Sequence, residues 1–97
     1  MFHISFRRLA QQDVESALEW YGRERSALAV SFTASLGATV RRIRESPQQF
    51  PKVYQDVRQA LLRRFPYAVF FVFRDDAVHV IAVVHLHRHP ESWRKRS

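Results

Sequence analysis

Three histidines alternate near the C-terminal end of the chain and are well suited to chemistry. His85, His87 and His89 stand at positions i, i+2 and i+4, so they would point to one face of a strand. An imidazole can move protons or ligate a metal. Because Pro90 follows at once and Arg88 would repel a cation, we predict no metal site, and a zinc site is the weaker alternative. His85 is expected either to transfer protons or to be half-buried and hydrogen-bonded to the backbone.

Arginines form the second set of residues with a clear chemical use. Fourteen of the sixteen basic side chains are Arg, whose planar guanidinium binds phosphate through paired hydrogen bonds. Cleavage of RNA by its own 2′-hydroxyl needs a base, an acid and cations, which His and Arg supply without a metal. The residues available for it are Arg58, Arg63, Arg64, His85 and Arg88. The alternative is that the arginines at 58–64 are solvated residues that protect an exposed strand edge.

The net charge points to an acidic partner. Sixteen basic residues against nine acidic ones give +7, with seven and five in residues 1–50 and nine and four in residues 51–97. The surplus is therefore mostly C-terminal. Such a charge favours association with nucleic acid, a ribosome or an acidic protein, and the alternative is an arginine-rich composition without a partner.

Hydrophobic periodicity predicts the elements that must position these residues. An alternation with period two predicts a strand at residues 2–6. Apolar residues at helical spacing predict amphipathic helices at 10–23 and 26–46. Ser26 is the expected N-cap of the second helix, and Pro47 forces its end. Two consecutive helices of this kind predict a helical hairpin.

The second half of the chain predicts a meander of strands. Residues 46–56 are predicted to be a loop because they hold two prolines and no sustained period. Strands are predicted at 57–65, 68–74 and 77–86, with Asp75-Asp76 as a tight hairpin turn. The fold class is therefore α+β in the order β-α-α-β-β-β. The helical hairpin is expected to pack on one face of a small, mainly antiparallel sheet and to leave the other face open.

Alternation along the last strand sorts its residues between the two faces of the sheet. The core face is predicted to hold Val78, Val80, Ala82, Val84 and Leu86. The open face is predicted to hold His79, Ile81, Val83 and His85. Together with arginines of neighbouring strands, the open face would form a concave basic surface suited to RNA phosphates.

Composition excludes several other classes of protein. The length of 97 residues predicts one domain over 1–97, with a basic tail from about residue 87 that Trp93 attaches to the body. The absence of cysteine excludes a disulfide framework and fits the cytoplasm. The longest apolar run, residues 65–73, is too short to cross a membrane. Without a glycine-rich phosphate loop or a serine nucleophile motif, no cofactor is expected.

Several residues follow one another in an order typical of a known group of proteins. They are Arg58, Phe65-Pro66-Tyr67, Phe71, Asp75-Asp76, Val83, His85, Arg88, Pro90 and Trp93. In this order the chain resembles the RelE/ParE toxin superfamily. Its members begin with a short strand, continue with two helices and end in a three-stranded meander. The resemblance covers essentially the whole chain and includes Leu18-Glu19-Trp20-Tyr21 in the first helix.

The resemblance implies the toxin of a type II toxin–antitoxin pair, which a cognate antitoxin neutralises in a hetero-oligomer. The antitoxin is expected to be acidic and encoded beside the toxin. RelE-like members cleave mRNA on the ribosome, and ParE-like members poison DNA gyrase. In the RelE-like case the resemblance implies a metal-free endoribonuclease with Arg58, Arg64 and His85 as catalytic residues. The residues expected to bind the target or phosphate are Arg63, Tyr67, His87, Arg88, Trp93 and Arg94. The alternative function is a non-enzymatic nucleic-acid-binding module on the same basic face.

Overall fold

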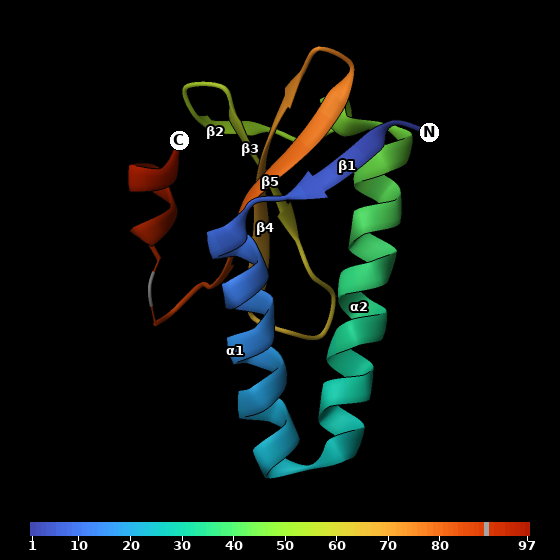
Figure 1. Ribbon diagram of the computed structural model, residues 1–97, viewed down its shortest axis with the longest axis vertical. Coiled ribbons are helices and arrows are strands. Elements are labelled where there is room, and N and C mark those ends of the chain that lie inside the picture. The colour runs from blue at the N-terminus through green and yellow to red at the C-terminus, as the bar shows by residue number, and fades with distance from the viewer. Residues whose placement is uncertain (89) are drawn as a thin grey trace.

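The computed structural model describes residues 1–88 and 90–97 and confirms the predicted α+β architecture (Figure 1). In these residues two helices form a hairpin against one face of a five-stranded sheet. The elements are β1 (His3–Phe6), α1 (Arg8–Glu24), α2 (Ser26–Glu45), β2 (Lys52–Tyr54), β3 (Val57–Leu61), β4 (Tyr67–Arg74) and β5 (Ala77–His85). Two short 3-10 helices are η1 (Pro47–Gln49) and η2 (Ser92–Arg96). No helix in the described residues is long and apolar enough to cross a membrane.

The sheet is mainly antiparallel, as predicted, with the strand order β1-β5-β4-β3-β2. β1 is the exception and runs parallel to β5. It pairs only with the first half of β5, from His3 opposite Ala77 to Phe6 opposite Val80. The chain then leaves the sheet to begin α1. The second half of β5 consequently has no strand beside it on that side within the described residues.

The segment between α2 and β3 is more regular than predicted. Residues 46–56 contain η1 and the short strand β2, which turns back onto β3 through Gln55 at φ 50°. The loop prediction is wrong at β2 because three residues are too few to show a period. The strand predicted at 57–65 ends earlier, at Leu61, and Arg64 in the following turn has a φ of 73° that a strand does not accommodate.

The helices and the final hairpin follow the prediction closely. α2 ends at Glu45, just before Pro47, and buries Phe32. The predicted capping by Ser26 is wrong, because the helix already begins at that residue and its cap residue makes no side-chain hydrogen bond. Asp75 and Asp76 have φ values of 55° and 58°, which are typical of the tight turn that joins twisted antiparallel strands.

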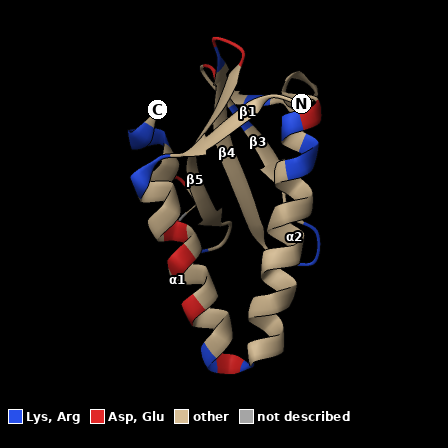
Figure 2. Cartoon of the chain, turned by 45° about the vertical axis from the view of Figure 1, so that its right-hand side comes forward, with Lys and Arg blue, Asp and Glu red and all other residues tan. Residues whose placement is uncertain are grey.

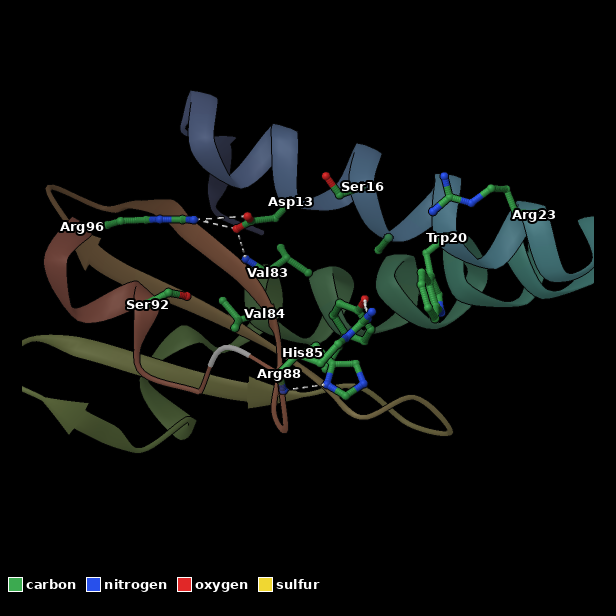
Figure 3. Close-up of a pocket in the computed structure, with 12 residues that line it drawn as sticks. Asp13, Ser16, Trp20, Arg23, Val83, Val84, His85, Arg88, Ser92 and Arg96 are labelled. Carbon is green, nitrogen blue, oxygen red and sulfur yellow. Dashed lines mark hydrogen bonds and ion pairs between the residues drawn. The ribbon is translucent and has the colours of Figure 1, made fainter.

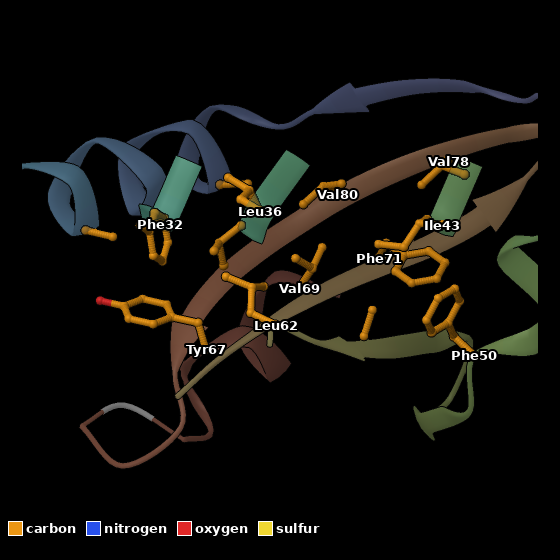
Figure 4. Close-up of a cluster of buried hydrophobic side chains, with 14 residues drawn as sticks. Phe32, Leu36, Ile43, Phe50, Leu62, Tyr67, Val69, Phe71, Val78 and Val80 are labelled. Carbon is orange, nitrogen blue, oxygen red and sulfur yellow. The ribbon is translucent and has the colours of Figure 1, made fainter. Parts of the chain in front are cut away.

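The main core lies between the helical hairpin and the sheet (Figure 4). Phe32 from α2 meets Tyr67 from β4 edge to face, with ring centroids 5.0 Å apart. Tyr21 from α1 stacks on Phe32 at 5.5 Å. Further along, Phe71 packs against Phe50 at 5.9 Å. Aromatic rings therefore hold the hairpin against β4, in addition to the apolar area they bury.

A bulge in β5 changes which residues face the helices. Phe70 pairs with Ala82 and Phe71 with Val80, so Ile81 is an extra residue in the ladder. Before the bulge Val80 belongs to the core beneath the helices, and after it Val83 does. The predicted sorting of β5 is therefore correct through Ile81 and wrong beyond it, since the extra residue reverses the alternation.

The face predicted to be open is covered. A second buried cluster lies on it and includes Phe70, Val72, Ile81 and Trp93. The Trp93 indole stacks on the Phe70 ring at 4.3 Å with an interplanar angle of 11° and is 4% exposed. The prediction that Trp93 attaches the C-terminal segment is confirmed, and η2 thereby covers this side of the sheet.

Candidate functional site

A groove of about 500 Å³ lies between α1, the end of β5 and the C-terminal segment (Figure 3). We call it the α1 groove. From α1 it takes Asp13, Ser16, Trp20 and Arg23, whose spacings of three and four residues place them on one side of the helix. The floor comes from the part of β5 that β1 leaves unpaired.

His85 reaches this groove because of the bulge in β5. His85 lies after the extra residue Ile81 and follows the alternation of Val83, toward the helices. Its ring meets that of Tyr67 edge to face at 5.2 Å, beneath the helical hairpin. The sequence placed His85 correctly at the end of the strand but on the wrong side of the sheet.

Arg88 is held between two aromatic side chains in the α1 groove. Its guanidinium carbon lies 4.8 Å from the centroid of the Trp20 ring, within range of a cation–π interaction. One of its nitrogens donates a hydrogen bond of 2.9 Å to the hydroxyl of Tyr67. Burial raises the pKa of the Tyr67 hydroxyl, and the positive charge of Arg88 opposes that rise. The groove therefore presents a fixed cation beside an indole that is 45% exposed.

His85 closes the turn that follows β5. Its Nδ1 accepts hydrogen bonds from the backbone N–H groups of His87 and Arg88 at 3.1 and 3.2 Å. An accepting Nδ1 carries no proton, so the neutral ring has its proton on Nε2. The predicted alternative of a half-buried imidazole bonded to the backbone is confirmed.

An ion pair closes the other end of the α1 groove. Arg96 donates to both carboxylate oxygens of Asp13, at 2.6 and 3.2 Å, and to the carbonyl of Ile81 at 3.1 Å. Asp13 also accepts from the backbone N–H of Val83 at 2.9 Å. The two side chains thus satisfy backbone groups on the edge of β5 that lacks a strand, as buried polar groups require.

Arg58, predicted to be catalytic, is used in the body of the protein. One nitrogen of its guanidinium donates to the carbonyl of Phe50 at 2.6 Å and to that of Gln48 at 3.2 Å. These bonds hold the end of η1 against β3. Arg58 lines neither this groove nor the one described next.

Arg63 and Arg64 lie in the turn between β3 and β4, beside α2. With Arg41 and Arg42 they line a second groove of about 440 Å³ along that helix. The carbonyl of Arg63 accepts a hydrogen bond of 2.6 Å from the hydroxyl of Ser35 on α2. The three residues predicted to be catalytic are therefore not gathered at one site: His85 lines the α1 groove and Arg64 the groove along α2.

The remaining predicted residues lie around the C-terminal segment. Arg94 packs against Tyr54, with its guanidinium carbon 5.2 Å from that ring, and forms an exposed ion pair with Glu91 at 2.8 Å. His87 is exposed and its ring lies 5.8 Å from that of His85. His89 lies outside the described residues, so the three-histidine zinc site is not tested. Among the described residues, no three His, Cys, Asp or Glu side chains could hold a metal ion together.

Most residues of the α1 groove were not predicted as site residues, and four of these are charged or aromatic. Asp13, Trp20 and Arg23 share one side of α1, for which the amphipathic pattern predicts only a helix, and Arg96 was predicted only as part of the basic tail. The spacing of polar and aromatic residues along α1 carried a signal for the first three. No local pattern connects Asp13 with Arg96, because they lie 83 residues apart.

Comparison with known proteins agrees with the architecture. A solved structure titled "Chromosomal ParDE TA system from P. aeruginosa" superposes with a TM-score of 0.77 at 17% identity. The match covers 88% of this chain and 96% of that chain, and at this identity it shows the fold alone. A search of curated protein sequences gives no match. The family described as "ParE toxin of type II toxin-antitoxin system, parDE" matches residues 4–92. The chain therefore belongs to the ParE toxin family of type II toxin–antitoxin systems.

Proposed function

We propose that this toxin inhibits growth by binding DNA gyrase and that it cleaves no RNA. The observation that carries the proposal is the dispersal of Arg58, Arg64 and His85 over separate places in the fold. Cleavage of RNA by general acid–base catalysis needs these groups within hydrogen-bond reach of one phosphate. A protein that acts by binding has no such requirement.

Arg58 and His85 also have structural tasks that oppose a catalytic role. Arg58 is engaged with two backbone carbonyls, and moving it onto a phosphate would leave those carbonyls without their donor. A proton on Nδ1 of His85 would remove the acceptor of two backbone N–H groups. The chain has only two lysines, Lys52 and Lys95, and so departs from the lysine cluster that resemblance to RelE-like members would imply.

The α1 groove supplies the features of a binding site instead. It combines the exposed indole of Trp20, the guanidinium of Arg88 beside that indole and the serines Ser16 and Ser92. Tryptophan and arginine are the residue types that carry much of the free energy of protein–protein binding. We propose that it contacts gyrase, with Trp20 and Arg88 as the principal residues.

We also infer that a cognate acidic antitoxin neutralises the protein in the cytoplasm. The family match and the similarity to the structure of a chromosomal ParDE TA system from P. aeruginosa support a toxin–antitoxin assembly. The net charge of +7 supports an acidic partner, since opposite charge speeds association and favours the correct complex.

Two assays with the purified protein test the target. In the first, gyrase supercoils a plasmid and toxin is added; we expect loss of supercoiling and accumulation of cleaved plasmid. In the second, ribosomes translate a defined mRNA; we expect the message to stay intact. In cells, thymidine incorporation should fall before methionine incorporation. Cleavage of the ribosome-bound message, abolished by His85→Ala, would overturn the proposal.

A further inference from the structure

The structure gathers basic side chains from both ends of the chain into one place. Arg7 and Arg8 stand at the start of α1, and Arg94, Lys95 and Arg96 belong to η2. Figure 2 shows the two blue segments next to each other, with the C-terminal segment beside the first turn of α1. One nitrogen of the Arg7 guanidinium reaches the carbonyl of Arg96 at 3.5 Å. We call these five residues the chain-end cluster.

The cluster is held in position by buried contacts. Trp93 packs on the sheet immediately before Arg94, and Arg96 is fixed by Asp13 with side chains only about one-fifth exposed, 20% and 19%. The residue between them, Lys95, is therefore displayed by a segment attached on both sides. A preorganised surface of this kind loses less conformational entropy on binding than a free tail does.

Nearby acids relieve the repulsion within the cluster only in part. Among the described residues the only ion pairs that reach it are Arg94 with Glu91 and Arg96 with Asp13. Arg7, Arg8 and Lys95 have no acidic partner there. Moreover, the first turn of α1 has no acidic residue, although the helix dipole favours acids and disfavours arginines at that position. A local arrangement that costs stability without a structural gain is typical of a functional surface.

We propose that the chain-end cluster binds the phosphate backbone of duplex DNA. Its members are all charged, and of the large apolar residues next to them in the sequence, Phe6, Leu9 and Trp93, only Leu9 is exposed. Interfaces with DNA are polar and strongly positive, whereas interfaces with proteins have an apolar and aromatic centre. The exposed indole of Trp20 lies twelve residues beyond Arg8, about 18 Å along the helix.

DNA binding by the chain-end cluster would add to the proposed binding of gyrase at the α1 groove. Gyrase acts on DNA, so a toxin bound to it is close to the duplex that the enzyme holds. That this duplex is the natural ligand rests on the proposed function. The binding of DNA by the cluster does not, and it can be measured without gyrase.

The test is fluorescence anisotropy with a labelled 20-base-pair duplex over a series of salt concentrations. The variant Arg7→Gln/Arg8→Gln/Lys95→Gln removes the three cations of the cluster for which residues 1–88 and 90–97 supply no acidic partner. The control variant Arg25→Gln/Arg41→Gln/Arg74→Gln removes the same charge from exposed positions elsewhere. We expect the first to bind DNA at least about 10-fold more weakly, with a salt slope shallower by about three, one for each lost phosphate contact. The control should keep most of the affinity and the slope.

Three outcomes would overturn the inference. One is equal loss of affinity in the two variants, which means that only net charge matters. Another is wild-type affinity in the cluster variant. The third is that this variant keeps DNA binding but loses binding to polyglutamate, which assigns the cluster to an acidic protein. Circular dichroism confirms folding, and single substitutions at Arg8 and Lys95 replace the triple variant if it unfolds. Failure of the proposed function shows separately, as unimpaired plasmid supercoiling by gyrase with wild-type toxin.

Discussion

The two faces of the sheet are buried to a similar depth but by very different means. On one face two long helices cover the strands, and aromatic rings from α1 and α2 interlock with β4. On the other, η2 covers them with five residues, held by one indole and one ion pair. The two faces therefore have different tasks. The helical face stabilises the fold, and the face covered by η2 positions the chain-end cluster.

The largest expected effect is on the helical face. Phe32→Ala removes a ring that is fully buried among Tyr21, Phe65 and Tyr67 and should lower the free energy of unfolding by about 4 kcal/mol. Urea unfolding monitored by circular dichroism measures the loss. The control Val30→Ala, at a position on the same helix that is 69% exposed, should lose under about 0.5 kcal/mol. A loss below about 2 kcal/mol for Phe32→Ala would mean that this face is not the main support.

Trp93→Ala tests the other face. We expect a smaller loss, about 3 kcal/mol, since the rest of η2 can move away rather than leave a rigid cavity. The distinguishing result is functional: a folded Trp93→Ala protein should bind the DNA duplex at least about 3-fold more weakly, because the cluster is no longer held. Urea unfolding and fluorescence anisotropy measure the two effects. Unchanged DNA affinity would show that attachment of η2 to the sheet is not needed to position the chain-end cluster.

Asp13→Ala sharpens the comparison by removing the ion pair without touching an apolar contact. The backbone N–H of Val83 would lose its carboxylate acceptor and the Arg96 guanidinium would keep only the carbonyl of Ile81, at a cost of about 2 kcal/mol. Glu15→Ala, two residues along α1 and exposed, is the matched control. Hydrogen exchange should report faster exchange of the Val83 amide in the Asp13 variant only. Equal protection in both variants would contradict the role given to Asp13.

The smallest effect concerns Tyr67, which links the core to the α1 groove. Tyr67→Phe removes the hydrogen bond from Arg88 and should cost about 1 kcal/mol at pH 7. Burial raises the pKa of Tyr67 in the folded state, so its stabilising contribution is complete below pH 10 and is lost as pH rises through the folded pKa. When unfolding is measured at a series of pH values from 8 upward, the free energy of unfolding should therefore fall less steeply in Tyr67→Phe than in the wild type. The free energy of unfolding of Tyr67→Phe should still fall somewhat as pH rises, because burial also raises the pKa of Tyr21.

Residues at regular spacing made most of the fold predictable. Apolar residues three and four apart fixed the buried side of α2, and Asp75-Asp76 fixed the final turn. β5 was harder, because a strand buried on both faces shows no alternation, and the extra residue Ile81 leaves no mark in a run of Val, Ile and Ala. The site was predictable only in part for another reason. Its residues come from α1, from β4 and β5 and from the last ten residues, and no spacing rule connects such distant segments.

The ion pair between Asp13 and Arg96 also bears on how the toxin is made. Ribosomes synthesise the chain from its N-terminus, so α1 and α2 can form early, whereas β1 must wait for β5 and Asp13 must wait for a partner 83 residues later. A polypeptide that stops before Trp93 leaves the face of the sheet away from the helices uncovered, and one that stops before Arg96 leaves the chain-end cluster incomplete. Truncated translation products would then be poor toxins, and the surface proposed to bind DNA would be completed only after Arg96 has been synthesised.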